Sequence, residues 1–237
     1  MNEKYQYAGG ELALFAKAIH WKKYVSRVIG PYIAGDVLEV GAGIGESTRL
    51  LHAWDHRSWL CVEPDSGLFQ ELRKTVSDLP DNHTVTCMQG FLADLGTKQL
   101  FDTILYIDVL EHIEKDASEM EAVSRYLRPG GHVIILAPAH QCLFTPFDAA
   151  IGHFRRYGKS SLQRIIPENI RILRMIYLDS VGLAASLANR FLLKQAMPTL
   201  GQIMTWDRML VPVSRIIDPL FRYRLGKTIV GVGKKTV

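Results

Sequence analysis

The chain has 237 residues, of which 48% are hydrophobic and 22% charged, and its formal net charge is +4. This length allows one doubly wound domain with an added segment and excludes a dinucleotide-binding core joined to a full substrate domain. No run of 18 apolar residues predicts a membrane span, and the amino-terminal residues lack a signal-peptide pattern. Three cysteines without metal-ligand spacing indicate a reducing, cytoplasmic location and no metal site.

The amino-terminal segment, at about 11–29, has helical periodicity. We expect its buried face to carry Leu12, Phe15, Ile19, Tyr24 and Val25. After it, apolar runs bounded by turn residues alternate with helical patterns, as the following ranges show. Strands are expected at 36–40, 58–63, 84–88, 101–107, 132–137, 170–177 and 228–233, and helices at 45–54, 66–77, 115–127 and 160–166.

This alternation predicts an α/β fold: a Rossmann-like, doubly wound and mostly parallel seven-stranded sheet with helices on both faces. We expect a single domain over 1–237. Its parts are a helical segment at 1–30, a core at 30–178, a helical insert at 179–226 and a last strand at 227–237.

Three alternating glycines follow the first strand, in the pattern G-x-G-x-G, and lead into a helix. A side chain at Gly41 or Gly43 would fill the space where backbone approaches a nucleotide ligand. Dinucleotide-binding loops carry glycine or alanine where this chain has Glu46. Glu39 lies inside the strand, where a buried carboxylate needs a partner. We expect that partner to be the amine or ammonium of a ligand; the alternative is a structural hydrogen bond within the protein.

A second acidic residue, Glu63, ends the next strand, 22 positions after Gly41. An acidic group at this place suits the two hydroxyls of a ribose. Asp65, two residues later, has a simpler explanation as the cap of the following helix. The fourth strand delivers Asp108, Glu111 and His112 to the same edge of the sheet.

Four motifs, E-V-G-A-G-I-G, V-E-P-D, I-D-V-L-E-H-I and L-R-P-G-G, occur in this order. Over about residues 30–178 the chain therefore resembles class I S-adenosylmethionine-dependent methyltransferases. The resemblance implies S-adenosyl-L-methionine as cofactor and S-adenosyl-L-homocysteine as product. It implies the following cofactor contacts: Glu39, Gly41 and Gly43 at the methionine part, Glu63 at the ribose and Asp108 near the methionine end. The usual acidic residue after the third strand is not evident, which leaves Gly90, Phe91 and Leu92 as candidates for the adenine.

A loop after the fifth strand contains G-H-F-R-R-Y at 152–157. It resembles the signature of a bacterial methyltransferase subgroup associated with natural-product and cell-surface saccharide pathways. Arg155 and Arg156 can clamp an anionic group of the acceptor, with Tyr157 beside them. The alternative is a structural latch in which either arginine pairs with Asp148 or Glu111.

A hydroxyl acceptor must lose a proton, and histidine suits that work at neutral pH. His112, His140 and His153 are the candidates for this catalytic base. If the acceptor is a carboxylate, a phosphonate or an amine, these histidines only orient it.

Charge is divided unevenly: residues 1–150 hold 13 Lys and Arg against 20 Asp and Glu, whereas residues 151–237 hold 15 against 4. The basic part indicates an anionic partner, which is a substrate group, a membrane surface or nucleic acid, unless it only favours solubility. In the insert, an apolar stripe with arginines around it favours packing on the sheet. A lid, a homodimer interface or peripheral membrane contact are the alternatives. The stripe comprises Met209, Leu210, Val213, Ile216, Ile217, Leu220 and Phe221. Trp206 would then help to form the acceptor pocket.

We therefore expect methyl transfer to oxygen or nitrogen of a small, anionic, saccharide- or natural-product-like acceptor. A nucleic-acid methyltransferase is disfavoured, because enzymes that act on exocyclic amines carry Pro-Pro-aromatic where this chain has Asp108-Val109-Leu110. We expect no nucleic-acid partner. The other alternative is a non-catalytic cofactor-binding or membrane-peripheral partner protein.

Overall fold

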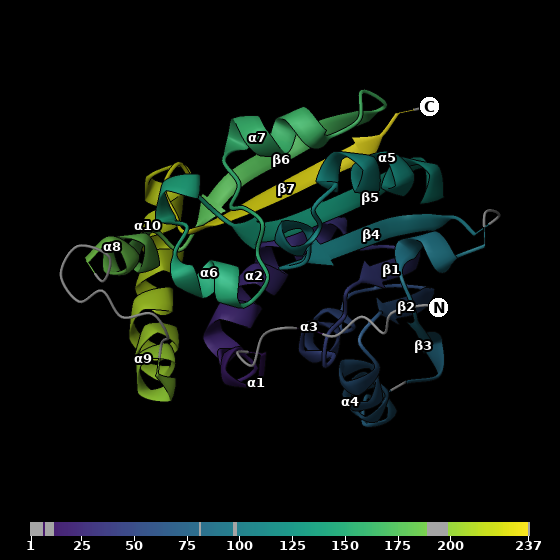
Figure 1. Ribbon diagram of the computed structural model, residues 1–237, viewed down its shortest axis with the longest axis horizontal. Coiled ribbons are helices and arrows are strands. Elements are labelled where there is room, and N and C mark those ends of the chain that lie inside the picture. Colours follow the sequence, from purple (N-terminus) through teal and green to yellow (C-terminus); the bar gives the residue numbers. More distant parts are fainter. Residues whose placement is uncertain (1–6, 8–11, 81, 97–98, 189–198, 237) are drawn as a thin grey trace.

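The computed structural model describes residues 7, 12–80, 82–96, 99–188 and 199–236. Seven strands form one sheet in the order β3-β2-β1-β4-β5-β7-β6. Strands β1 to β5 run parallel, and β7 runs antiparallel between β5 and β6. The predicted α/β fold, with a mostly parallel seven-stranded sheet, is confirmed (Figure 1). The strands are β1 (Asp36–Val40), β2 (Ser58–Glu63), β3 (Val85–Gln89), β4 (Phe101–Ile107), β5 (Leu127–Pro138), β6 (Ile170–Leu178) and β7 (Thr228–Lys235).

Helices cover both faces of the sheet and enclose two apolar cores. One core combines buried side chains of α2, α3 and α4 with the sheet, and the other lies under α5 and α7. The helices of the core are α1 (Leu12–Phe15), α2 (Ile19–Ile29), α3 (Glu46–Leu51), α4 (Ser66–Ser77), α5 (Asp116–Tyr126), α6 (Pro146–Ala150) and α7 (Lys159–Ile165). The sheet is therefore buried on both sides, which explains why its central strands are continuous apolar runs.

The amino-terminal segment differs from the expected single helix. It forms α1 and α2 with a break at Ala16 to Ala18, and residue 11 lies outside the described residues. Tyr24 and Val25 are buried as predicted, but the expectation for Ile19 is wrong, because its side chain is 55% exposed. No side chain of this segment caps α2, whose N-cap is Ala18. Asp207 of the insert does so instead, accepting hydrogen bonds from the His20 and Trp21 amides at 3.2 and 2.8 Å.

The insert before β7 consists of α8 (Ser180–Ala188), α9 (Leu200–Thr205), a π-helical turn (Trp206–Leu210) and α10 (Val211–Leu220). Residues 189–198 of the expected helical insert lie outside the described residues. Figure 1 shows α8, α9 and α10 grouped at one end of the molecule. The expected packing of its apolar stripe on the sheet is wrong. Met209, Ile216 and Leu220 are 64%, 68% and 76% exposed.

Polar side chains occupy the inner side of α10 in place of that stripe. Asp218 is fully buried and accepts hydrogen bonds from the Tyr24 hydroxyl, the Asp179 amide and the Ser180 amide and hydroxyl. The Ser214 hydroxyl, also buried, donates to Asp179 at 2.7 Å. Periodicity predicted the helix but not its orientation, because buried hydrogen bonds turned the apolar side outward. Among the described residues, no helix has both the length and the apolar character to cross a membrane.

Candidate functional site

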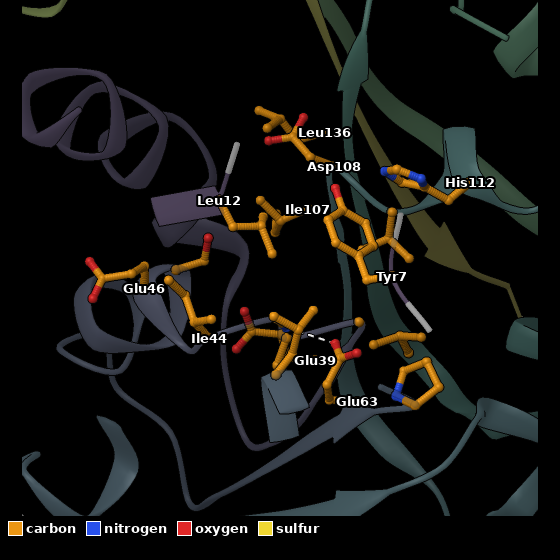
Figure 2. A pocket seen from close by; sticks show the side chains of 18 of the residues that line it. Tyr7, Leu12, Glu39, Ile44, Glu46, Glu63, Ile107, Asp108, His112 and Leu136 are labelled. Atoms are coloured by element: carbon orange, nitrogen blue, oxygen red, sulfur yellow. Dashed lines mark hydrogen bonds between the residues drawn. The ribbon is translucent and has the colours of Figure 1, made fainter. Parts of the chain in front are cut away.

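A cavity of about 590 Å³ lies at the carboxyl ends of the central strands, next to α1 and α2 (Figure 2). Its size is typical of small-molecule and cofactor sites. The position of the cavity follows from the topology of the sheet, since open parallel sheets bind ligands beyond the carboxyl ends of their strands. All eight residues that the sequence assigned to the cofactor line this one cavity: Glu39, Gly41, Gly43, Glu63, Gly90, Phe91, Leu92 and Asp108.

The glycine loop adopts a backbone that favours glycine. Gly41 and Gly43 have φ of +65° and +58°. A Cβ at Gly41 would lie 2.6 Å from Val109, whereas at Gly43 it would point into open space near Leu12. Any side chain at Gly43 would therefore enter the cavity and reduce the room for a ligand.

Glu39 is buried at the base of the cavity. Its Oε2 atom accepts hydrogen bonds from the Thr48 hydroxyl at 2.8 Å and the Trp59 indole at 3.0 Å. Among the described residues, no hydrogen bond reaches its Oε1 atom, which leaves one oxygen for a ligand donor. Burial raises the pKa of Glu39 to about 7 despite these hydrogen bonds. An ammonium group beside it would favour the ionised carboxylate.

Glu63 connects β2 to the glycine loop. Its Oε2 accepts the Gly43 amide at 2.8 Å, and its Oε1 accepts the Asp65 amide at 2.9 Å. Each carboxylate oxygen has a second lone pair, so both can still accept a ribose hydroxyl. Asp65 caps α4 through the Gly67 and Leu68 amides, as its simpler interpretation held. The two neighbouring acids thus have different roles.

The loop after β3 offers an aromatic wall. Phe91 lines the cavity with its side chain 50% exposed, and Leu92 is buried next to it. The Asp94 carboxylate accepts the Phe91 amide at 2.8 Å, so it fixes the loop. A planar base can stack on an exposed ring, which explains how adenine could be held without the usual acidic residue.

At the opposite end, Asp108, His112 and Tyr7 meet. Figure 2 shows Tyr7 beside His112 with its hydroxyl directed toward Asp108. The Tyr7 and His112 rings are 5.4 Å apart between centroids. Asp108, at φ +54°, faces the cavity, and its desolvated position in the protein raises its pKa to about 6. Burial, and then the neighbouring His153, lower the pKa of His112 to about 4, so its imidazole is neutral at pH 7.

Behind His112 lies a buried cluster. The His153 ring contacts His112 at 4.5 Å between centroids, and His153 Nε2 lies 3.8 Å from Glu111 Oε1. Glu111 is fully buried, neither of its carboxylate oxygens has a hydrogen-bond partner in the described structure, and burial raises its pKa well above the usual range. Each of the three residues offers a potential metal ligand atom within 4.8 Å of the others. The absence of a metal site therefore stays a prediction.

The remaining predicted residues lie outside the cavity lining. His140 Nε2 is 2.9 Å from the Gly226 carbonyl oxygen, and its ring contacts Tyr177. The Trp206 indole donates to Asp179 at 2.7 Å, while its ring contacts Phe15 and Trp21, which do line the cavity. A substrate role for Trp206 and a catalytic role for His140 stay predictions.

The G-H-F-R-R-Y loop is held by its own ion pairs. Arg156 forms a two-point contact with the buried Asp148 at 2.8 and 2.9 Å, the pairing that the latch alternative anticipated. Burial alone would raise the pKa of Asp148, but hydrogen bonds from His153 and Arg156 outweigh it and hold the pKa below its usual range. Arg155 pairs with Asp116, which also accepts the Tyr157 hydroxyl at 2.8 Å. The acceptor-binding role of Arg155, Arg156 and Tyr157 stays a prediction.

Sequence reasoning missed the part of the cavity that comes from the amino-terminal segment. Tyr7, Ala16, Trp21 and Lys22 line it together with Leu12 and Phe15, which were assigned only to a buried helix face. Lys22 lies near Glu46, with 3.2 Å between Nζ and Oε2. The signal was weak, because an amphipathic segment of this kind is equally consistent with ordinary packing.

Comparisons with known proteins agree with this geometry. Residues 37–131 match the family model described as a methyltransferase domain. Lovastatin nonaketide synthase mokA of Monascus pilosus is 27% identical over an alignment of 140 residues, which covers 54% of this chain and 4% of that protein. The chain thus spans only a small part of the curated relatives that it matches.

Solved structures resemble nearly the whole chain. A chain of the complex between the Haloferax volcanii Trm112 methyltransferase activator and a methyltransferase has a TM-score of 0.67 at 15% identity, covering 97% of this chain and 96% of that chain. The N-methyltransferase NodS of Bradyrhizobium japonicum, bound to S-adenosyl-L-homocysteine, has a TM-score of 0.58 at 12% identity, covering 93% and 87%. Residues 37–131 are thus similar to a methyltransferase domain, and the fold of the chain is similar to that of solved methyltransferases, one of which binds S-adenosyl-L-homocysteine.

Proposed function

We propose that the protein transfers a methyl group from S-adenosylmethionine to a hydroxyl oxygen or an amine nitrogen of a small-molecule acceptor. The observation that carries this proposal is the cavity itself. Glu39, Glu63 and the glycine loop lie at one part of it, and a neutral histidine and a carboxylate, His112 and Asp108, lie at another. The cofactor supplies an electrophilic methyl group on a sulfonium.

The protein must hold the acceptor atom in line with that methyl group, about 3 to 3.5 Å away, and exclude water. His112 is neutral at pH 7, so a ring nitrogen can accept the proton that a hydroxyl or ammonium group loses. Asp108 is ionised at that pH and can balance the positive charge nearby. His153 supports the His112 ring from behind, and it is held in turn by Asp148 at 3.1 Å.

The shape of the acceptor end supports a small, partly apolar molecule. Leu12, Phe15, Trp21 and Val25 provide an apolar wall beside the polar groups. An anionic group on the acceptor would meet Lys22 inside the cavity, whereas Arg155 and Arg156 would first have to release Asp116 and Asp148. The likeness to a polyketide synthase and the G-H-F-R-R-Y loop support a natural-product or saccharide acceptor.

Incubation with methyl-labelled S-adenosylmethionine and small-molecule extracts of the host, followed by mass analysis, tests the proposal. We expect one class of compound, small enough to fit in the cavity, to gain a single methyl group. The label should disappear with a Gly43→Val variant. Binding of S-adenosylhomocysteine without any labelled product would favour the non-catalytic alternative. Label in RNA or protein fractions alone would contradict a small-molecule acceptor.

A further inference from the structure

The outer side of α10 exposes a continuous apolar ridge. Met209 lies in the π-helical turn just before α10, four residues ahead of Val213. Val213, Ile216 and Leu220 of α10 are spaced by three and four residues, which at 100° per residue places them on one narrow stripe. The exposed fractions of Met209, Val213, Ile216 and Leu220 are 64%, 44%, 68% and 76%, and the ridge continues through Phe221 at 54%. Soluble proteins scatter single apolar residues over their surface, but a contiguous stripe of this kind marks a contact site.

The opposite side of the same helix carries the polar residues. Asp207, Val211, Ser214 and Asp218 are buried. Asp207 accepts a backbone amide of α2, and Asp218 accepts the hydroxyl of Tyr24, also in α2, and the Asp179 amide. The Ser214 hydroxyl bonds to Asp179 and Val181. The helix is therefore fixed in this orientation by its polar inner side. Rotating it to bury the ridge would leave two buried carboxylates without their donors, which costs more free energy than burial of the apolar stripe would gain.

Positive charge borders the ridge. Arg208, Arg215, Arg222 and Arg224 are all exposed, and no ion pair holds any of them in the described structure. The acidic residues of 199–226 are Asp207 and Asp218, and both are buried. The outer surface of this segment thus combines aliphatic and aromatic side chains with cationic groups and carries no exposed carboxylate.

Two of these arginines, Arg222 and Arg224, lie in the turn that ends α10. Arg222 and Tyr223 have φ of +51° and +56°, a left-handed conformation that is unfavourable for residues other than glycine. This turn places Arg222 and Arg224 with Leu220 and Phe221 around one hollow, which Leu225 completes. Strained backbone persists where the surroundings fix it, and it is common at binding surfaces.

We propose that this α10 surface, formed by Met209, Val213, Ile216, Leu220, Phe221, Leu225, Arg208, Arg215, Arg222 and Arg224, binds the surface of an anionic lipid bilayer. Apolar side chains would enter the region between headgroups and acyl chains, and the arginines would remain at the level of the lipid phosphates. Each basic residue near an anionic membrane adds to the attraction.

A second copy of the chain is a poorer occupant. Two-fold pairing of this surface with itself would bring two sets of arginines together without any exposed carboxylate to neutralise them. An anionic bilayer instead supplies the missing negative charge along with an apolar layer. The proposal does not depend on the methyl acceptor, because vesicle binding needs no turnover.

Flotation of the full chain with phosphatidylcholine vesicles, with and without phosphatidylglycerol, tests the proposal at low and high salt. We expect binding to the anionic vesicles only, weakened by salt. The triple variant R208Q/R215Q/R222Q should bind on the order of 100-fold more weakly, at about five-fold per charge. The variant I216S/L220S should lose about ten-fold or more, with an unchanged melting temperature, because both side chains are exposed.

The variant R73Q/R125Q/R171Q is the matched control, since it removes three exposed arginines from other parts of the surface. It should keep most of the vesicle binding. The proposal is overturned if the wild type does not float with anionic vesicles, or if the control loses as much binding as the α10 variant. A wild-type dimer in light scattering that I216S/L220S dissociates, without any vesicle binding, would overturn it in favour of a subunit interface.

Discussion

The cofactor cavity and the helical insert use the same kinds of residue in opposite ways. Around the cavity, Glu39 and Glu63 are buried and hold the glycine loop and its neighbours, with space left for a ligand. In the insert, Asp207 and Asp218 are buried too, but their acceptor sites are taken by backbone amides and hydroxyls of the chain. The groups of the insert that remain open to a partner therefore lie on its outer surface, whereas those of the core lie inside the cavity.

The insert and the cavity are also in direct structural contact through α2. Asp207 caps α2, and α2 contributes Trp21, Lys22 and Val25 to the cavity wall. The buried polar side of the insert thus stabilises one wall of the site, while its apolar side faces outward. A change in the insert can affect the cavity without touching the ligand.

The largest expected effect concerns the acceptor end of the cavity. His112→Ala should lower kcat by about 10² to 10⁴-fold, the range for a general base, and leave cofactor affinity nearly unchanged. His83→Ala is the matched control, because His83 is exposed and lies outside the cavity lining. Steady-state kinetics with the identified acceptor distinguish the two. Equal activity of both variants would exclude His112 as the base.

The insert should respond to changes in stability according to the side of α10 that is altered. Asp218→Ala removes a fully buried acceptor of four hydrogen bonds, so it should destabilise the protein by about 3 to 5 kcal/mol. Ile216→Ser on the outer side should change stability by less than about 0.5 kcal/mol. Denaturant unfolding measures both. A large loss for Ile216→Ser would show that the ridge is covered within the folded chain.

Cofactor binding should depend on Glu63. Glu63→Ala removes a charged acceptor for the ribose and the support of the Gly43 amide, so S-adenosylhomocysteine should bind more weakly by about 1.5 to 3 kcal/mol. Glu71→Ala, on the exposed side of α4, should bind normally. Full affinity of the Glu63 variant would place the ribose elsewhere.

The latch in the G-H-F-R-R-Y loop can be separated from an acceptor site. Arg156→Gln leaves Asp148 buried without its main partner and should lower stability by about 3 kcal/mol, and the double variant with Asp148→Asn should recover part of it. If Arg156 serves only this ion pair, KM for the acceptor stays within about two-fold in the double variant. A ten-fold rise in KM at normal stability would support the acceptor role instead.

The smallest effect is a change in protonation on cofactor binding. Asp108 has a pKa raised from 3.8 to about 6, so near pH 6 it is partly protonated in the free protein. A positively charged sulfonium nearby favours its ionised form, and binding of S-adenosylmethionine should therefore release up to about half a proton at that pH. S-adenosylhomocysteine, without the sulfonium, should release fewer. Calorimetry in two buffers of different ionisation enthalpy measures the difference, which Asp108→Asn should abolish.

The same pKa shift has a consequence for stability. Protonated Asp108 stabilises the folded state below pH 3.8, and this contribution is lost as the pH rises through about 6. His112 acts in the opposite direction, because its lowered pKa gives a contribution that is present above pH 6.5 and lost as the pH falls toward 4. Asp108→Asn should therefore steepen the gain in stability between pH 4 and 6.

The sequence predicted the core of the fold, and it assigned to the cofactor eight residues that line one cavity, because these features depend on local signals. Alternating apolar runs indicated the strands, and the positive φ of Gly41 and Gly43 agrees with the steric argument for glycine. At the acceptor end the sequence indicated Asp108 and His112 but not Tyr7 and Trp21, because these two reach it from a segment far away in the sequence. The orientation of α10 was missed for a related reason, since Asp218 finds Tyr24 only in the folded chain.

Isothermal titration of the purified protein with S-adenosylhomocysteine tests the central claim, that this cavity holds the cofactor between Glu63 and Asp108. We expect one site per chain in the wild type, binding weakened on the order of 10-fold or more in Glu63→Ala, and loss of binding in Gly43→Val, whose side chain would enter the cavity. Unchanged binding in both variants, or tighter binding of NAD than of S-adenosylhomocysteine, would contradict it.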